Sequence, residues 1–371
     1  MSRRAAPAAA AAIALALAAA LSSPWLSAVT AQQPGKPVAP KFAVDPFWPK
    51  PLPNRWILGQ ASGVAVDSRD DVWIIQRPRT LTDDERGAAL TPPRSECCVP
   101  APPVMQFDSA GNLLQAWGGP GQGYDWPTNE HGIFVDAQSN VWLAGNGEKD
   151  NQVLKFTRDG RFLMQIGKPG MSKGDADTQN LNRPADTRVD PAANELYVAD
   201  GYGNHRVIVF DATTGAYKRH WGANGKAPGD PGVKQFGNTH CVRIARDGLV
   251  YVCDRSNNRI QVFKKDGTFL KEFQVAPATK GPGSVWDVDF SADLPQTYLY
   301  TADGENNHVW LLLRDNGSIL SSFGRSGRYA GQFHWIHNMA VDSKGNIYTT
   351  EVDNAKRVQK FVYQGLFPVG S

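Results

Sequence analysis

An internal repeat constrains the fold of this chain more than any other feature of its sequence. Six segments share one pattern: an apolar stretch runs to an aspartate or its equivalent, a polar turn follows, and a second apolar stretch begins. The segments start at Ser62, His131, Ala185, His240, Trp286 and His337. Short alternating strands that recur with a period of about 50 residues are typical of propeller blades.

The repeats predict an all-β fold, a six-bladed β-propeller. Copies continue with a β-branched or aromatic strand, as in "RVIVFD" and "RIQVFKKDG", and most end in a fourth strand before Trp-Gly, Phe-Gly or Ile-Gly. Such four-stranded sheets bury their faces by packing radially around an axis. The last copy lacks its fourth strand, and we expect the segment "KFAVDPF", residues 41–47, to supply it and close the ring. The motif "YVADGYGNHRVIVF" resembles the NHL-type repeat.

The ends of the chain fall outside the repeats. Residues 1–31 have the pattern of a secretory signal peptide, because two arginines precede a short Ala- and Leu-rich run and then small residues. An uncleaved anchor is the alternative, although the apolar run is short for a membrane span. We therefore expect a periplasmic or secreted protein. Its predicted parts are the signal peptide, an N-terminal segment at 32–58, the propeller at 59–366 and a tail at 367–371.

One insertion and four cysteines depart from the repeat. Residues 79–103, between the second and third strands of the first copy, are rich in proline and charge. A loop of this length is usually functional or disordered, so we expect either a lid over the axial channel or a solvated insertion. The adjacent Cys97 and Cys98 are candidates to stiffen this loop through a bridge. Cys241 and Cys253 fall on neighbouring strands, as a disulfide or as two buried thiols.

A column of histidines gives the repeat its strongest functional signal. Five residues before the aligned aspartate, the six copies read Ser62, His131, Ala185, His240, Trp286 and His337. The histidines thus occupy every second blade, at the start of the innermost strand, so three imidazoles should converge on the axis from three directions. Three histidines with an open fourth direction are the ligands of a catalytic zinc site. The alternative is that each histidine caps or fills the channel through hydrogen bonds.

A second column follows at the end of the next strand, where the chain turns towards the same mouth. This column contains Arg77, Tyr202 and Arg255. Arginine binds a carboxylate through a bidentate fork, and a tyrosine hydroxyl beside a cation can serve as a general base. The alternative for the two arginines is pairing with the repeat's own aspartates, Asp200 or Asp254, across blade junctions.

At these residues the chain resembles the peptidyl-α-hydroxyglycine α-amidating lyases. The resemblance extends from His131 to Phe361, and it rests on "EHGIFVD", "YVADGYGNHRVIVF", "THCVRIA", "CDRSNNRIQVF" and "IHNMAVD". In that family zinc binds the hydroxyl of a hydroxyglycine, an arginine holds its carboxylate, and a tyrosine accepts the proton as the C–N bond breaks to give an amide and glyoxylate. The resemblance implies a Zn²⁺ site at His131, His240 and His337, with Tyr202, Arg255 and Arg77 as catalytic residues.

Two positions depart from the pattern of the family. Its aspartate after the last zinc histidine helps to bind a structural calcium, and here that position is Asn338. An amide offers an oxygen without a charge, so Asn338 is a candidate Ca²⁺ ligand of reduced strength. The family's cysteine after its tyrosine is replaced by Gly203, which removes that disulfide.

The sequence therefore predicts an exported zinc-dependent carbon–nitrogen lyase for a small-molecule or peptide C-terminal substrate. The net charge is +3 and no Lys or Arg run forms a stripe, so nothing indicates a nucleic-acid partner. We expect a monomer with no membrane contact after signal cleavage. The alternatives are a non-catalytic NHL-type binding module and a lactonase-like hydrolase, which would bind calcium through axial carboxylates such as Asp186 and Asp287.

Overall fold

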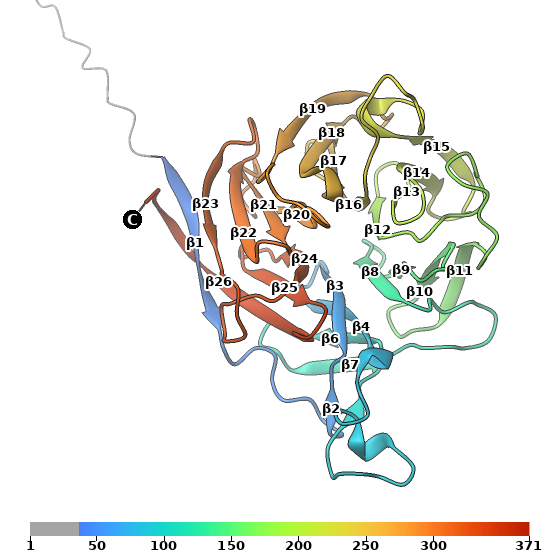
Figure 1. The fold of residues 1–371 in the computed structure, drawn as a ribbon, viewed down its shortest axis with the longest axis vertical. Coiled ribbons are helices and arrows are strands. Elements are labelled where there is room, and N and C mark those ends of the chain that lie inside the picture. The colour runs from blue at the N-terminus through green and yellow to red at the C-terminus, as the bar shows by residue number, and fades with distance from the viewer. Residues whose placement is uncertain (1–36, 371) are drawn as a thin grey trace, which may run out of the picture. The chain divides into compact units, whose positions relative to one another are not determined.

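The computed structural model describes residues 37–370, so the predicted signal peptide lies outside the described residues. Within this range, six four-stranded antiparallel sheets follow one another around a central axis (Figure 1). The prediction of an all-β, six-bladed propeller is confirmed. The described residues contain no helix with the length and apolar character that a membrane span requires.

The first three blades follow the chain in order, each with its first strand innermost. Blade 1 consists of β3 (Gln60–Val66), β4 (Val72–Arg77), β6 (Val104–Phe107) and β7 (Leu113–Trp117). Blade 2 consists of β8 (Glu130–Val135), β9 (Val141–Gly145), β10 (Gln152–Phe156) and β11 (Phe162–Gly167). Blade 3 consists of β12 (Asp186–Asp190), β13 (Glu195–Asp200), β14 (Arg206–Asp211) and β15 (Tyr217–Trp221).

The last three blades repeat this arrangement. Blade 4 consists of β16 (Thr239–Ile244), β17 (Val250–Asp254), β18 (Arg259–Phe263) and β19 (Phe269–Gln274). Blade 5 consists of β20 (Asp287–Phe290), β21 (Tyr298–Asp303), β22 (His308–Leu313) and β23 (Ile319–Phe323). Blade 6 takes β24 (Ile336–Val341), β25 (Ile347–Glu351) and β26 (Arg357–Pro368) from one end of the chain and β1 (Val38–Asp45) from the other.

The pairing of β1 with β26 closes the ring. The two strands are antiparallel, with Val38 opposite Pro368 and Asp45 opposite Lys360. In Figure 1 they lie side by side as the blue and red ends of the described chain. The N-terminal segment thus supplies the missing fourth strand, as predicted, although the strand begins at Val38 rather than Lys41. This pairing covers the edge that blade 6 would otherwise expose.

The aligned aspartate explains why the repeat is visible in the sequence. Asp136 Oδ1 accepts hydrogen bonds from the backbone amides of Gln138 and Asn140, at 3.0 and 2.8 Å, and so fixes the turn between β8 and β9. Its Oδ2 accepts the indole N–H of Trp142 at 3.0 Å. The indole is fully buried, so without the carboxylate its N–H would lack a partner.

The hydrophobic core lies between neighbouring blades. Apolar side chains from the facing sheets of adjacent blades form separate clusters around the ring. Examples are Trp73 with Leu143 between blades 1 and 2, Tyr197 with Val242 between blades 3 and 4, and Tyr300 with Met339 between blades 5 and 6. Because each sheet is buried by its neighbours, the ring holds the six innermost strands at fixed positions around the axis.

The insertion at residues 79–103 folds back onto the N-terminal segment. Its strand β5 (Val99–Pro100) pairs in parallel with β2 (Trp56–Ile57). On the other side, Glu85 forms an ion pair with Lys356 of blade 6, at 2.6 Å. The two cysteine bridges that the sequence left open are both present, Cys97–Cys98 within the insertion and Cys241–Cys253 between β16 and β17.

Candidate metal centre

The three histidines of the column come together on the innermost strands of blades 2, 4 and 6. His131 lies on β8, His240 on β16 and His337 on β24. Each contributes a ring nitrogen to a cluster in which these atoms all lie within 4.8 Å of one another. The ring centroids are 4.6–5.0 Å apart, and all three side chains are buried. The structure therefore brings together the three residues that the sequence pattern selected.

The other three positions of the column orient the imidazoles. Each histidine Nδ1 bonds to the backbone oxygen of the column residue in the next blade. The pairs are His131 with Ala185 at 2.8 Å, His240 with Trp286 at 2.5 Å and His337 with Ser62 at 2.6 Å. A carbonyl oxygen only accepts hydrogen bonds, so each Nδ1 carries the proton and each Nε2 keeps its lone pair. This tautomer is the one in which a histidine can ligate a metal through Nε2.

The electrostatics of the cluster favour neutral imidazoles. Burial is the main cause that lowers the pKa of His131, His240 and His337 well below the ordinary value. The neighbouring histidines lower the pKa of His131 further, Arg255 lowers that of His240, and Arg77 and Arg255 lower that of His337. Neutral imidazole is the form that binds metal ions. The residues thus fit a metal that prefers nitrogen ligands.

Tyr202 places its hydroxyl beside two of these imidazoles. It lies in the loop between β13 and β14, and its Oη is 3.0 Å from Nε2 of His131 and 3.1 Å from Nε2 of His240. Arg255 Nη1 donates to the same oxygen at 3.0 Å. One phenolic oxygen therefore contacts two imidazole Nε2 atoms and a cation.

Arg255 is held by aromatic rings and a carbonyl rather than by an aspartate. Its guanidinium carbon lies 5.4 Å from the ring centre of Tyr202 and 4.5 Å from that of Trp286. Its Nε donates to the backbone oxygen of Pro282 at 3.2 Å. These contacts fix the guanidinium while leaving it without a carboxylate partner among residues 37–370.

Arg77 ends β4 on the opposite side of the mouth. Its Nε donates to the backbone oxygen of Glu130 at 2.7 Å and its Nη1 to Oε1 of Gln60 at 2.9 Å. Burial lowers the pKa of Arg77 to about 10, so the guanidinium keeps its charge at neutral pH. The repeat's aspartates, which were the alternative partners of the two arginines, pair inside their own blades. Asp200 binds Arg206 at 2.9 Å, and Asp254 binds Arg259 at 2.6 Å.

Four of the predicted site residues line one cavity that has an aromatic wall. The cavity has a volume of about 340 Å³ and is lined by Arg77, Tyr202, Arg255 and His337 among others. Trp335, which the sequence reasoning did not single out, lines the same cavity, and its ring centre lies 5.4 Å from that of Trp286. The signal for Trp335 was only its place two residues before His337. Asp353 also lines the cavity, and its carboxylate pairs with His334 at 2.8 Å. The cavity thus offers two cations without carboxylate partners among the described residues, a phenol and apolar surface, a combination suited to an anion with an apolar group.

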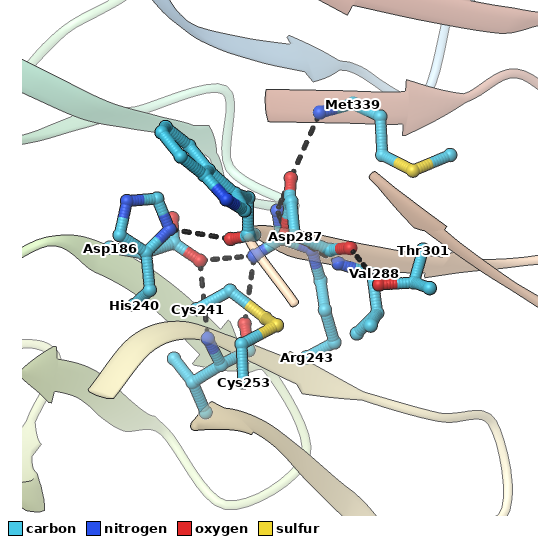
Figure 2. The surroundings of a disulfide bond; sticks show 11 residues. Asp186, His240, Cys241, Arg243, Cys253, Asp287, Val288, Thr301 and Met339 are labelled. Carbon is cyan, nitrogen blue, oxygen red and sulfur yellow. Dashed lines mark hydrogen bonds and ion pairs between the residues drawn. A yellow bond between two sulfur atoms is a disulfide. The ribbon is translucent and has the colours of Figure 1, made fainter. Parts of the chain in front are cut away.

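Asn338 and the two axial carboxylates lie one residue further along the innermost strands. Asn338 Oδ1 accepts the backbone amide of Val64 at 2.8 Å and so joins blade 6 to blade 1. Asp186 and Asp287 both bind the guanidinium of Arg243 (Figure 2). In the structure these two carboxylates, which a lactonase-like site would offer to calcium, face an arginine.

Comparison with known proteins gives matches to the repeat and to whole propellers. The NHL repeat model matches residues 181–210 and 236–263. NHL repeat-containing protein 3 of Mus musculus is 28% identical over 344 residues, which cover 87% of this chain and 84% of that protein. Peptidyl-alpha-hydroxyglycine alpha-amidating lyase 1 of Drosophila melanogaster is 29% identical over 346 residues, which cover 86% of this chain and 59% of the lyase.

A solved structure shows the same architecture at low identity. The streptogramin B lyase structure superposes with a TM-score of 0.55 at 12% sequence identity. The match covers 87% of this chain and 98% of that chain. At this identity the likeness shows the fold alone.

Proposed function

We propose that this β-propeller, which matches the NHL repeat model in two segments and is similar to an amidating lyase, is a zinc-dependent carbon–nitrogen lyase. The proposed substrate is an N-acylated α-hydroxyglycine, either a small molecule or the C-terminus of a peptide. The products are an amide and glyoxylate. One observation carries the proposal: three imidazoles with unprotonated Nε2 atoms cluster together, and the hydroxyl of Tyr202 contacts two of these atoms.

His131, His240 and His337 would hold the zinc ion through Nε2, because their Nδ1 atoms are engaged by carbonyls. When bound, zinc supplies a Lewis acid that favours ionisation of the substrate hydroxyl. Three protein ligands leave a coordination position for substrate, as in other catalytic zinc sites.

Two arginines bind the carboxylate of the substrate. Arg255 is held against Tyr202 and Trp286 with its guanidinium free of any acidic partner among the described residues, and Arg77 keeps its charge although it is buried. A guanidinium fork matches the two oxygens of a carboxylate. This contact orients the α-carbon so that its hydroxyl faces the histidines.

Tyr202 moves the proton. Its Oη accepts the proton of the substrate hydroxyl while the bond between the α-carbon and the amide nitrogen breaks. The electron pair of that bond goes to the nitrogen, which takes the same proton back from Tyr202 and leaves as the amide, and the α-carbon becomes the aldehyde of glyoxylate. All atoms of the substrate appear in the two products, so the reaction needs no oxidant and consumes no water.

Glyoxylate release from α-hydroxyhippurate tests the proposal. We expect purified protein with one zinc per chain to produce glyoxylate and benzamide, and His240→Ala to lose both zinc and turnover. His220→Ala is the matched control, because His220 lies on the outer strand β15 and should leave both unchanged. Zinc binding without glyoxylate would reject the lyase and keep the metal centre. A folded wild-type protein that binds no metal would favour the non-catalytic binding module.

A further inference from the structure

A buried arginine lies on the axis beside the histidine cluster. Arg243 is on β16, three residues after His240, and is almost completely buried. Its Nη1 donates to Oδ2 of Asp186, and its Nη2 lies 2.6 Å from Oδ1 of Asp287. Both carboxylates are buried too. Figure 2 shows the guanidinium between them, so one cation of blade 4 links the innermost strands of blades 3 and 5.

Both carboxylates directly follow residues that orient the metal-binding histidines. Asp186 comes after Ala185, whose carbonyl accepts from His131. Asp287 comes after Trp286, whose carbonyl accepts from His240. The two carbonyls lie one peptide unit away from the two aspartates. Contacts that hold the carboxylates in place therefore also hold these carbonyls.

The same carboxylates reach the strands of the remaining ligands. Asp287 Oδ2 accepts the backbone amide of Met339 on β24 at 2.9 Å, two residues after His337. Asp186 Oδ2 accepts the amide of Val242 on β16 at 3.3 Å, two residues after His240. The ion cluster formed by Arg243, Asp186 and Asp287 thus touches segments adjoining all three histidines.

Electrostatics requires a cation at this place. Two buried carboxylates that face each other repel, and each loses hydration on burial. Proteins often compensate such carboxylates with Ca²⁺, which takes oxygen ligands. Here the planar guanidinium supplies the charge and donates to both sides in a fixed geometry.

We propose that Arg243 is a built-in structural cation that takes the place of a metal ion next to the histidine site and positions His131 and His240 for zinc. Arg243 is a positioning residue, because it hydrogen-bonds to none of the three histidines and acts through the backbone segments that Asp186 and Asp287 hold. The inference rests on the metal centre of the proposed function, but not on the lyase reaction, and its test measures metal affinity and stability rather than turnover.

The test compares wild type with Arg243→Ala and with the matched variant Arg259→Ala. Arg259 lies in the same blade and is also buried and paired with an aspartate, at 2.6 Å. Its partner Asp254, however, does not follow a residue whose carbonyl accepts from a histidine. Zinc affinity is measured by competition with a chelator, and the melting temperature is measured with and without millimolar Ca²⁺. We expect Arg243→Ala to weaken zinc binding by about 10- to 100-fold, as the loss of outer contacts does at other metal sites. Arg259→Ala should lower the melting temperature without this change in zinc affinity.

Calcium provides the second readout. In Arg243→Ala the two carboxylates lose the cation that contacts both of them, so Ca²⁺ should raise the melting temperature of this variant by about 2 °C or more and recover part of the zinc affinity. Wild type and Arg259→Ala should not respond. Unchanged zinc affinity in Arg243→Ala, or an equal response of wild type to Ca²⁺, would overturn the inference.

Two further variants keep the test decisive if Arg243→Ala does not fold. Arg243→Lys retains the charge but cannot fork to both carboxylates, and we expect a zinc affinity between those of wild type and the alanine variant. Asp186→Asn removes one charge with little change of shape and should weaken zinc binding as well. Wild-type affinity in both would contradict a positioning role. If wild type itself binds no zinc, the metal centre fails, whereas the calcium response still tests the built-in cation.

Discussion

The Tyr202→Phe substitution tests the chemistry of the cavity with the smallest change of structure. It removes one oxygen, which lies 3.0 and 3.1 Å from the two Nε2 atoms and 3.0 Å from Arg255 Nη1. The phenyl ring that remains keeps its stacking against the guanidinium, because that contact involves the ring face. The variant therefore isolates the hydroxyl from the shape of the pocket.

The expected loss follows from the role of the hydroxyl as proton acceptor. Positioned acid–base groups contribute about 10²- to 10⁴-fold to a rate, which corresponds to about 3–5 kcal/mol of transition-state stabilisation. We expect kcat for α-hydroxyhippurate to fall by this factor. The KM should change little, because the arginines and the aromatic wall that bind the substrate are retained.

The assay is steady-state glyoxylate release, with zinc content measured on the same samples. Tyr217→Phe is the matched control, since that hydroxyl also contacts a histidine, Nδ1 of His220 at 2.9 Å, but on the outer strand β15. Zinc should stay at one per chain in both variants. A kcat of Tyr202→Phe within about threefold of wild type would refute the role of Tyr202 as proton acceptor. Loss of zinc in this variant would instead show that the tyrosine helps to hold the metal.

Three further predictions address the repeat, the pH dependence of stability and the aromatic wall. Asp136→Ala leaves the buried indole N–H of Trp142 without a partner and should lower the free energy of unfolding, measured by urea denaturation, by about 1–3 kcal/mol. A double-mutant cycle with Trp142→Phe should give a coupling energy of about 1 kcal/mol, and additive effects would contradict the hydrogen bond. The hydrogen bond from Arg219 lowers the pKa of Glu195 from 4.5 to about 2, so this carboxylate stabilises the fold above its ordinary pKa and loses the effect as the pH falls towards 2. The destabilisation by Glu195→Gln should therefore be largest near neutral pH and shrink below about pH 4.5, and a constant difference would argue against the ion pair. Trp335→Ala should raise the KM for α-hydroxyhippurate by about tenfold and that for the N-acetyl analogue much less; equal effects would exclude contact with the acyl group.

The fold was predictable because the same side chains stabilise the equivalent turn in several blades. Asp136 stabilises a turn and accepts the indole N–H of Trp142. The same hydrogen bond recurs in blade 1, where the indole N–H of Trp73 donates to Asp67 at 3.0 Å. The alternation of histidines was visible for the same reason, once the copies were aligned on this aspartate. Because the repeated contacts are made by side chains, the sequence alone shows both the blades and the equivalent positions within them.

Contacts made by the backbone left no trace in the sequence. The carbonyls of Ser62, Ala185 and Trp286 orient the imidazoles, and every residue type has a carbonyl. The alternation in the column hinted that these positions differ in role, but it did not show that they accept hydrogen bonds. Their function follows only from the close approach of neighbouring innermost strands.

Ion pairs were predictable only where register determines them. Asp200 lies directly opposite Arg206 on the paired strands β13 and β14, so the partner of this aspartate could be read from the hairpin. Arg243 instead meets carboxylates of two other blades, 44 and 57 residues away in sequence. Such a pairing depends on how blades approach the axis, which the sequence pattern alone does not specify.

X-ray absorption spectroscopy at the zinc edge tests the central claim most directly, because it reports the atoms around the metal in the intact protein. We predict one zinc per chain with three imidazole nitrogens at about 2.0–2.1 Å and one further light atom. The triple variant at His131, His240 and His337 should bind no zinc at this site. A spectrum with sulfur ligands or with fewer than three imidazoles, or a folded wild-type protein that takes up no zinc, would contradict the account.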